Sequence, residues 1–185
     1  IKEFLPLLSS SELAIKKHTK PCPGCKVPVE KNEGCNHMSC TNCKTHFCWL
    51  CATEIEGYND LDRHVCNRFS PIGEENFDAK ERDSFYLLRY DHMGDSKRFA
   101  ERQLDYLVKK FKSEDAMYDI NTEDLDVLTK AAECLISSRH FLKYTYVVAW
   151  AWSAETKGGE RKVLFENHQA TLAVFSEKLA SLTQI

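Results

Sequence analysis

The sequence has no apolar run of the roughly 20 residues that a membrane-spanning helix needs. The longest such run, Tyr144 to Trp152, is short and rich in aromatic residues. A secretory leader is not visible either, because Ile1 to Leu8 contains two charged residues and no small-residue cleavage site. These absences predict a cytoplasmic or nuclear protein that does not bind membranes. The chain begins with Ile1 rather than Met, which indicates a piece of a longer protein.

An excess of positive charge is missing as well. Residues 1–70 hold nine Lys and Arg against eight Asp and Glu, a net charge of +1. Residues 71–185 hold sixteen against twenty, a net charge of −4. Proteins that bind nucleic acids through phosphate contacts carry a basic patch or stripe. The charge balance therefore argues against nucleic acid as a partner.

Cysteine is abundant but very unevenly placed. Eight of the nine cysteines lie between Cys22 and Cys66, and Cys134 stands alone in a region with a helical pattern. A dense cysteine cluster indicates either a disulfide framework of a secreted domain or metal ligands in a reducing compartment. The repeated CxxC spacing and the missing leader favour metal, and CxxC pairs are typical of tetrahedral zinc sites. Cys134 is expected to be a buried or half-buried thiol of a helix.

A count of possible ligands leaves one cysteine over. Two tetrahedral zinc ions need eight ligands, whereas the cluster offers eight cysteines and His64. The simplest assignment is sequential, although spacing alone leaves an interleaved arrangement open. It gives the first zinc Cys22, Cys25, Cys40 and Cys43, and the second Cys48, Cys51, His64 and Cys66.

The cysteine left over, Cys35, has neighbours that suit a nucleophile. It lies in a polar loop directly after Gly34, so we expect it to be exposed, and His37 follows two residues later. A thiolate is the reactive form of cysteine, and a nearby imidazole can assist its chemistry. An inert thiol beside a structural zinc site is the alternative interpretation.

The pattern from residue 77 onward is helical, with apolar residues at intervals of three and four. One stripe runs from Tyr86 to Phe111 and is interrupted by Lys97; a second runs from Leu125 to Ala149 and is interrupted by Arg139. Asn121 or Thr122 can cap the second helix. The third stripe consists of Phe165, His168, Leu172, Phe175, Leu179 and Leu182. Three helices with one apolar face each predict an antiparallel bundle.

Four segments of the zinc-binding region resemble the catalytic Rcat domain of RING-between-RING ubiquitin ligases. They are Cys22-Pro-Gly-Cys25, Val29 to Met38, Phe47-Cys48-Trp49-Leu50-Cys51 and Cys66-Asn67-Arg68-Phe69. The helical region is similar to the Ariadne domain of the same family. Its matches are Arg89-Tyr90, Lys143-Tyr144-Thr145-Tyr146, Leu164-Phe165-Glu166-Asn167 and Gln169-Ala170.

The resemblance implies a fold and a domain order. The fold is a small two-zinc Rcat domain with short β-hairpins, followed by an all-α Ariadne helical bundle. We expect residues 1–19 to be the end of a linker from a preceding IBR domain and residues 20–69 to form the Rcat domain. Residues 70–76 would link it to residues 77–185, which would form a truncated Ariadne domain.

The resemblance also implies a mechanism. Cys35 accepts ubiquitin as a thioester from a conjugating enzyme, which a first RING domain recruits, and passes it to a lysine of a protein substrate. His37 matches the general base, and both zinc ions are structural. A neddylated cullin assembly is a possible activator in this family. A zinc-dependent protein-interaction scaffold without thioester chemistry is the alternative.

The Ariadne domain of this family restrains the catalytic cysteine. By register, the inhibitory phenylalanine of the family falls on Phe99. The acidic residue that follows it in the family falls on Ala100, and Glu101 is a possible replacement. A second acidic position of the family falls on Glu177. The single residue between His64 and Cys66 departs from the family spacing. His46 is therefore the other candidate ligand, and it can alternatively assist His37 or be merely exposed.

Overall fold

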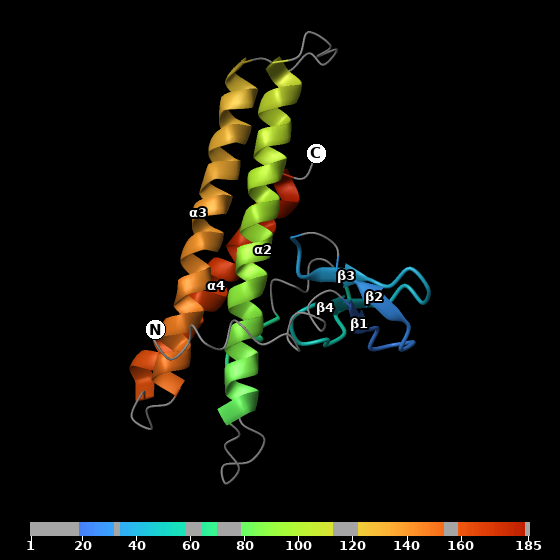
Figure 1. Ribbon diagram of the computed structural model, residues 1–185, viewed down its shortest axis with the longest axis vertical. Helices are drawn as coiled ribbons and strands as arrows, with labels where there is room; N and C mark the ends of the chain where they lie inside the picture. Colours follow the sequence, from blue (N-terminus) through green and yellow to red (C-terminus); the bar gives the residue numbers. More distant parts are fainter. Residues whose placement is uncertain are drawn as a thin grey trace.

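The computed structural model describes residues 19–31, 34–57, 64–69, 79–112, 122–153 and 159–183. Its first part is a pair of short antiparallel hairpins (Figure 1). Strand β1 (Thr19–Pro21) pairs with β2 (Pro28–Glu30), and β3 (His37–Ser39) pairs with β4 (His46–Cys48). Three-residue strands bury very little apolar surface, so these hairpins need another source of stability.

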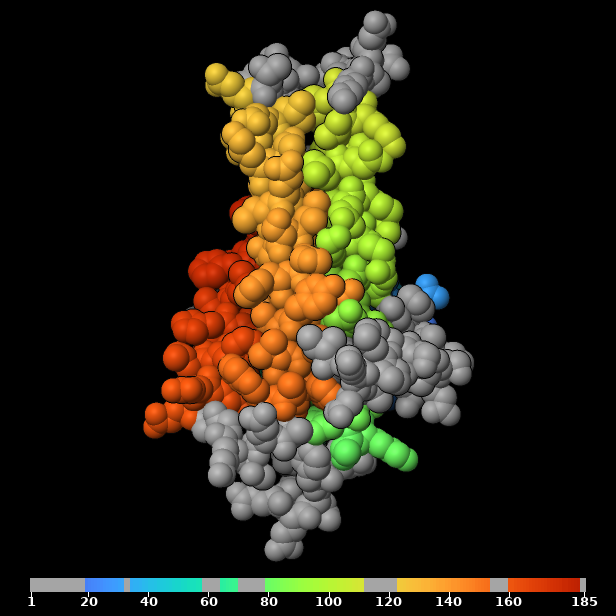
Figure 2. All heavy atoms as spheres, turned by 60° about the vertical axis from the view of Figure 1, so that its left-hand side comes forward, coloured from blue at the N-terminus to red at the C-terminus, as the bar shows by residue number. Residues whose placement is uncertain are grey.

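Three long helices form the second part: α2 (Ala79–Lys112), α3 (Thr122–Ser153) and α4 (Gly159–Thr183). They run antiparallel, α3 contacts both α2 and α4, and the far ends of α2 and α3 extend beyond α4 (Figures 1 and 2). The predicted fold class, zinc-type hairpins followed by an all-α bundle, is thus confirmed. None of the three described helices has an apolar stretch long enough to cross a bilayer.

The main core joins the three helices around side chains that the stripes predicted. Its buried members are Tyr86, Leu87, Met93, Leu142, Tyr146, Val147, Ala149 and Trp150. Complete burial of one large apolar side chain contributes about 1.5–3 kcal/mol, so this cluster is a main source of stability for the bundle. A smaller cluster of Ala100, Leu135 and Ala180 lies where small side chains let the helices approach closely.

The two polar interruptions of the stripes have different environments. Lys97 is half-buried and forms an ion pair with Glu101 one turn later, at 2.6 Å. Arg139 is 2% exposed, and its Nη1 donates to the carbonyl of Ser96 on α2 at 2.7 Å. A buried guanidinium must be hydrogen-bonded to be tolerated, so Arg139 fixes the position of α3 against α2.

The stripe predicted for α4 is partly wrong. Phe175 and Leu182 are 62% and 77% exposed, and His168 is exposed as well. The buried positions include polar residues instead: Glu166, Gln169, Ser176 and Glu177. Two of them have polar partners on other elements: Glu177 accepts from Asn36, and Gln169 accepts from Asn67 and donates to Thr145 of α3.

Cys134 is exposed on α3, so the expected burial of its thiol is wrong. It lies on a solvent-facing side of α3, whereas the next residue, Leu135, is buried in the cluster with Ala100 of α2 and Ala180 of α4. The predicted linker 70–76 lies outside the described residues.

Candidate metal centres and active site

The three CxxC pairs adopt the same turn. In each, the amide of the residue after the second cysteine donates to the carbonyl of the first cysteine, at 2.8–2.9 Å. The amide of the first cysteine donates to the carbonyl two residues beyond the second, at 2.9 Å. The residue after the second cysteine has a positive φ in all three turns: Lys26 (64°), Lys44 (63°) and Ala52 (58°).

These turns carry a conformational cost. A non-glycine residue in the left-handed region costs about 1–2 kcal/mol, and here the cost occurs three times in a domain with little core. Binding of a structural metal supplies far more free energy than that. The repeated turn therefore fits a domain whose folding is coupled to metal binding.

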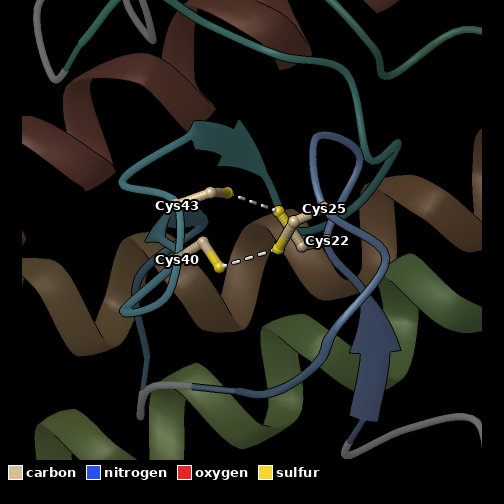
Figure 3. Close-up of side chains that lie close together, drawn as sticks. All are labelled: Cys22, Cys25, Cys40 and Cys43. Atoms are coloured by element: carbon tan, nitrogen blue, oxygen red, sulfur yellow. Dashed lines mark hydrogen bonds between the residues drawn. The ribbon is translucent and has the colours of Figure 1, made fainter.

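The turns bring together the first cluster, Cys22, Cys25, Cys40 and Cys43, whose sulfur atoms converge on one point (Figure 3). The distance is 3.6 Å between the Sγ atoms of Cys22 and Cys43, and 3.7 Å between those of Cys25 and Cys40. Four thiolates at about 2.3 Å from a tetrahedral zinc have sulfur atoms about 3.8 Å apart. The donor set and the spacing thus fit zinc.

The second cluster consists of Cys48, Cys51, His64 and Cys66. The Sγ atoms of Cys48 and Cys66 are 3.9 Å apart, and Nε2 of His64 lies 3.0 Å from Sγ of Cys51. Within each cluster all four ligand atoms lie within 4.8 Å of one another. The sequential assignment is confirmed, with His64 in the eighth position, and His46 lies outside both clusters.

Among the described cysteines of the zinc domain, Cys35 alone belongs to neither cluster. Its side chain is 8% exposed, so the expected exposure is wrong. The helices α2 and α4 cover the loop around Cys35 (Gly34 to Asn36), through residues 62 and 141 positions away in sequence. The amide of His37 points at Sγ of Cys35, at 3.3 Å. A hydrogen bond from an amide to sulfur favours the thiolate form.

Helix α2 covers the loop at Gly34. This glycine has a φ of +85°, and a Cβ on it would lie 2.6 Å from Cδ1 of Phe99. The Oγ of Ser96 donates to the Gly34 carbonyl at 2.7 Å. Only glycine suits both the backbone conformation and the close approach of the phenyl ring. Ala100, by contrast, packs inside the bundle, and Glu101 pairs with Lys97.

Helix α4 covers the loop from another side, at Asn36. The Glu177 carboxylate, 7% exposed, accepts from the Asn36 amide at 3.1 Å and from its Nδ2 at 3.3 Å. Hydrogen bonds to a buried charged group are among the stronger ones in proteins. Phe99 and Glu177 therefore lie on the two residues that flank Cys35 in the sequence.

The two histidines of the second hairpin lie together beside this loop. Nε2 of His37 and Nδ1 of His46 are 3.0 Å apart, and the rings stack at 5.0 Å with an interplanar angle of 13°. Burial, and secondarily the neighbouring His46, lower the pKa of His37. His37 is thus held in its neutral form near pH 7, in which one ring nitrogen can accept a proton.

Lys31 is a site residue that the sequence reasoning missed. Its Nζ donates to the Cys35 carbonyl at 2.7 Å and lies 5.7 Å from the centre of the Trp49 ring. Burial lowers the pKa of Lys31 to about 8, although the charges of Glu177 and Cys35 oppose the shift. Lys31 lies in the segment from Val29 to Met38 that carries the resemblance, which could have pointed to a role. The sequence pattern gave no indication that its side chain contacts the Cys35 carbonyl.

The chain after the last ligand is tied to the helices by a second set of contacts. Arg89 of α2 donates to the Cys66 carbonyl through Nη2 at 2.6 Å and through Nε at 3.2 Å. Nδ2 of Asn67 donates to the Glu166 carbonyl at 2.6 Å and to Oε1 of Gln169 at 2.9 Å. The helical motifs that carried the resemblance thus include the residues that hold the zinc domain on the bundle.

Comparison with known proteins gives one family match and several relatives. The sequence model described as "IBR domain" matches residues 15–57. The chain is 33% identical to the mouse "E3 ubiquitin-protein ligase ARIH2" over 175 residues, which cover 90% of this chain and 34% of that protein. It is 35% identical to the human "E3 ubiquitin-protein ligase ARIH1" over 176 residues, covering 90% and 30%.

A third relative is the "Potential E3 ubiquitin-protein ligase ariadne-2" of Caenorhabditis elegans, 33% identical over 174 residues, which cover 90% of this chain and 35% of that protein. The chain therefore spans about a third of the length of the curated relatives it matches. The matched part includes both the zinc clusters and the helices.

Proposed function

Because this chain belongs to the Ariadne family of RING-between-RING proteins, we propose that it is the catalytic part of a ubiquitin ligase that transfers ubiquitin through a thioester on Cys35. One observation carries the proposal. The two zinc clusters use seven of the eight cysteines between residues 22 and 66. The eighth, Cys35, has a backbone amide on its sulfur, and the contacting pair of His37 and His46 lies beside its loop.

The transfer takes two steps. The Cys35 thiolate attacks the carbonyl carbon of the thioester between ubiquitin and a conjugating enzyme, and the thiolate of that enzyme leaves. A lysine amine of the substrate then attacks the Cys35 thioester, and the Cys35 thiolate leaves. Cysteine is suited to both steps, because its thiolate is a good nucleophile and a good leaving group.

His37 is proposed as the general base of the second step. A lysine amine must lose a proton to attack, and a neutral imidazole near pH 7 can accept it. Nδ1 of His46 lies 3.0 Å from Nε2 of His37, so the tautomers of the two rings are coupled. The lowered pKa of His37 keeps it in the neutral form that a base requires.

The helical region is proposed to restrain Cys35. The loop is held at Gly34 by Ser96 and Phe99 and at Asn36 by Glu177. A ubiquitin thioester cannot reach a sulfur that is covered in this way. Transfer therefore requires that the helices move away from the loop, and an activating partner would stabilise the released state. A neddylated cullin assembly is one such candidate.

Zinc would stabilise the fold, because four protein ligands close each site and leave no open position. The proposed partners are ubiquitin, a conjugating enzyme recruited by a first RING domain elsewhere in the complete protein, and a protein substrate. The cytoplasm or the nucleus is the proposed location. Residues 20–69 and 77–185 are proposed as the Rcat and Ariadne domains. The second candidate function is a zinc scaffold in which Cys35 forms no thioester.

Mass spectrometry after reaction with a ubiquitin that carries a C-terminal electrophile separates the two functions. The zinc-loaded chain should form one adduct that disappears in Cys35→Ser and persists in Cys134→Ser, the matched control for a free thiol. Phe99→Ala should form the adduct several times faster. An adduct that persists in Cys35→Ser, or none in Phe99→Ala with both zinc ions bound, would favour the scaffold.

A further inference from the structure

Lys31 directly follows strand β2 and holds the catalytic loop from the zinc-domain side. Its ammonium group donates to the carbonyl of Cys35 itself, at 2.7 Å. Its position beside the Trp49 ring is in turn fixed, because Trp49 is 1% exposed and its amide donates to the Asn36 carbonyl at 2.8 Å. The positive charge therefore has a defined place next to the proposed nucleophile.

A largely buried ammonium group needs negative charge nearby. The charged or titratable groups around the loop come from every element packed on it. They are Lys31, His37 and His46 of the zinc domain, His92 and Asp95 of α2, Arg139 of α3 and Glu177 of α4. Among the groups that favour the charged form of Lys31, Glu177 has the largest effect and Cys35 the next.

The two negative groups belong to different parts of the molecule. Cys35 and Lys31 are both in the zinc domain and stay together when the helices move. Glu177 is on α4, and two hydrogen bonds to Asn36 attach it to the loop. When α4 leaves, Lys31 loses the carboxylate and keeps the thiol. At the same time, the thiol loses a neighbouring negative charge that opposes its ionisation.

We propose that Lys31 is a positioning residue for Cys35. While α4 covers the loop, Glu177 neutralises the charge of Lys31. Once α4 leaves, this charge stabilises the Cys35 thiolate. Release of the helix then makes Cys35 more reactive as well as more accessible. The inference rests on the proposed function, since it assigns Lys31 and Glu177 a role toward the same nucleophile. It adds an electrostatic part to the steric cover that Phe99 provides.

The two effects can be measured separately by alkylation of Cys35 with iodoacetamide over a range of pH. The rate at high pH reports how accessible the thiol is, whereas the midpoint of the pH profile reports the charge around it. Alkylation is quantified on the peptide that contains Cys35, in the zinc-loaded chain. The variants are Lys31→Met, Lys31→Arg, Glu177→Gln and the double variant Lys31→Met/Glu177→Gln.

Glu177→Gln should lower the midpoint by about one pH unit, a typical effect of one neighbouring charge. Lys31→Met should raise it, and Lys31→Arg, which keeps the charge, should stay near the wild type. In the double variant the shift caused by Glu177→Gln should be smaller than in the wild-type background, because only the direct effect of the carboxylate on the thiol is left. A midpoint unchanged in Lys31→Met, or an equal Glu177→Gln shift in both backgrounds, would overturn the inference.

Lys20→Met is the matched control. Lys20 lies over the same Trp49 ring, at 5.2 Å, but donates to the carbonyls of Trp49 and Leu50 rather than to that of Cys35. It should leave the midpoint unchanged, and a shift as large as that of Lys31→Met would also contradict the inference. Bound zinc is measured for each variant to show that it folds. If Lys31→Met does not fold, the midpoints of Lys31→Arg and Glu177→Gln are each compared with that of the wild type.

The same variants react with the electrophilic ubiquitin to separate this inference from the proposed function. If Cys35 forms the ubiquitin adduct while the pH profiles of all variants coincide, the role of Lys31 is wrong and the ligase function stands. If no variant forms the adduct, including Phe99→Ala with both zinc ions bound, the proposed function fails, and the inference with it.

Discussion

The phenyl ring of Phe99 lies so close to Gly34 that a single added methyl group would overlap it, with 2.6 Å between Cβ and Cδ1. This contact joins helix α2 to the residue directly before Cys35. The accessibility of the cysteine is therefore coupled to one helix–loop contact. A larger residue at position 34 would therefore disturb the packing of α2 over Cys35 without removing any side chain.

Gly34→Ala should destabilise the covered state. The added methyl group meets the Phe99 ring, and a φ of +85° costs a non-glycine residue about 1–3 kcal/mol. We expect a lower free energy of unfolding and faster alkylation of Cys35. Gly57→Ala is the matched control, because nothing lies within 4 Å of a Cβ at that position. Equal alkylation rates in the two variants would show that the contact does not limit access.

Asn67→Ala should loosen α4 from the zinc domain. The change removes the two donations from Nδ2 and leaves the Glu166 carbonyl and the Gln169 side chain without these donors in a buried place. The cost of such a loss is about 1–3 kcal/mol. Hydrogen exchange of the α4 amides should become faster.

Arg68→Ala is the comparison for that variant. Arg68 contacts Asn167 of α4 at the surface and lies 3.9 Å from the Glu166 carboxylate. Arg68 is 40% exposed although Glu166 is buried, and we expect a long pair with one solvent-exposed partner to contribute about 1 kcal/mol or less. Exchange in α4 should therefore change less than in Asn67→Ala. An effect of Arg68→Ala as large as that of Asn67→Ala would contradict the view that the buried amide holds the helix.

Removal of zinc should unfold the hairpins and leave the bundle. A strong chelator should make the eight cysteines of the zinc domain react with a thiol reagent, while the helical circular dichroism signal stays close to its starting value. The helices have their own apolar core, whereas the hairpins depend on metal. Zinc content should be two ions per chain in Cys134→Ser and fall in Cys43→Ser. Loss of the helical signal on chelation would show that the bundle depends on the zinc domain.

Stability should decrease as the pH falls below about 6.5, and His92 should contribute to the decrease. His92 is 4% exposed, and burial together with Lys31 and Arg139 holds its pKa well below the usual range. The unfolded chain takes up a proton near pH 6.5 that the folded chain does not, so the free energy of unfolding falls with falling pH. For one proton the slope is at most about 1.4 kcal/mol per pH unit.

Denaturant unfolding at pH 8, 6 and 5 measures this slope. His92→Gln should give a shallower dependence than the wild type between pH 6.5 and 5, whatever its stability at pH 8. His168→Gln, at an exposed position of α4, should keep the wild-type slope. A slope in His92→Gln equal to that of the wild type would assign the pH dependence to other groups.

The sequence by itself determined the local parts of this protein. The CxxC spacing predicted three pairs of ligands, since each turn of four residues brings its own two cysteines together, but it left open which pairs share a metal site. The apolar intervals predicted α2 and α3 and their buried faces, because helical periodicity depends only on neighbours along the chain. Counting ligands singled out Cys35 by the same local reasoning.

The tertiary structure alone decided what surrounds these parts. The burial of Cys35 and the polar buried side of α4 depend on where α2 and α4 meet the loop around Cys35. The exposure of Cys134 depends on which side of α3 the other two helices cover. Such contacts join residues 60–140 positions apart, and no periodicity encodes them. The sequence thus singled out Cys35 as the proposed nucleophile, and the packing of α2 and α4 on its loop decided that it is covered.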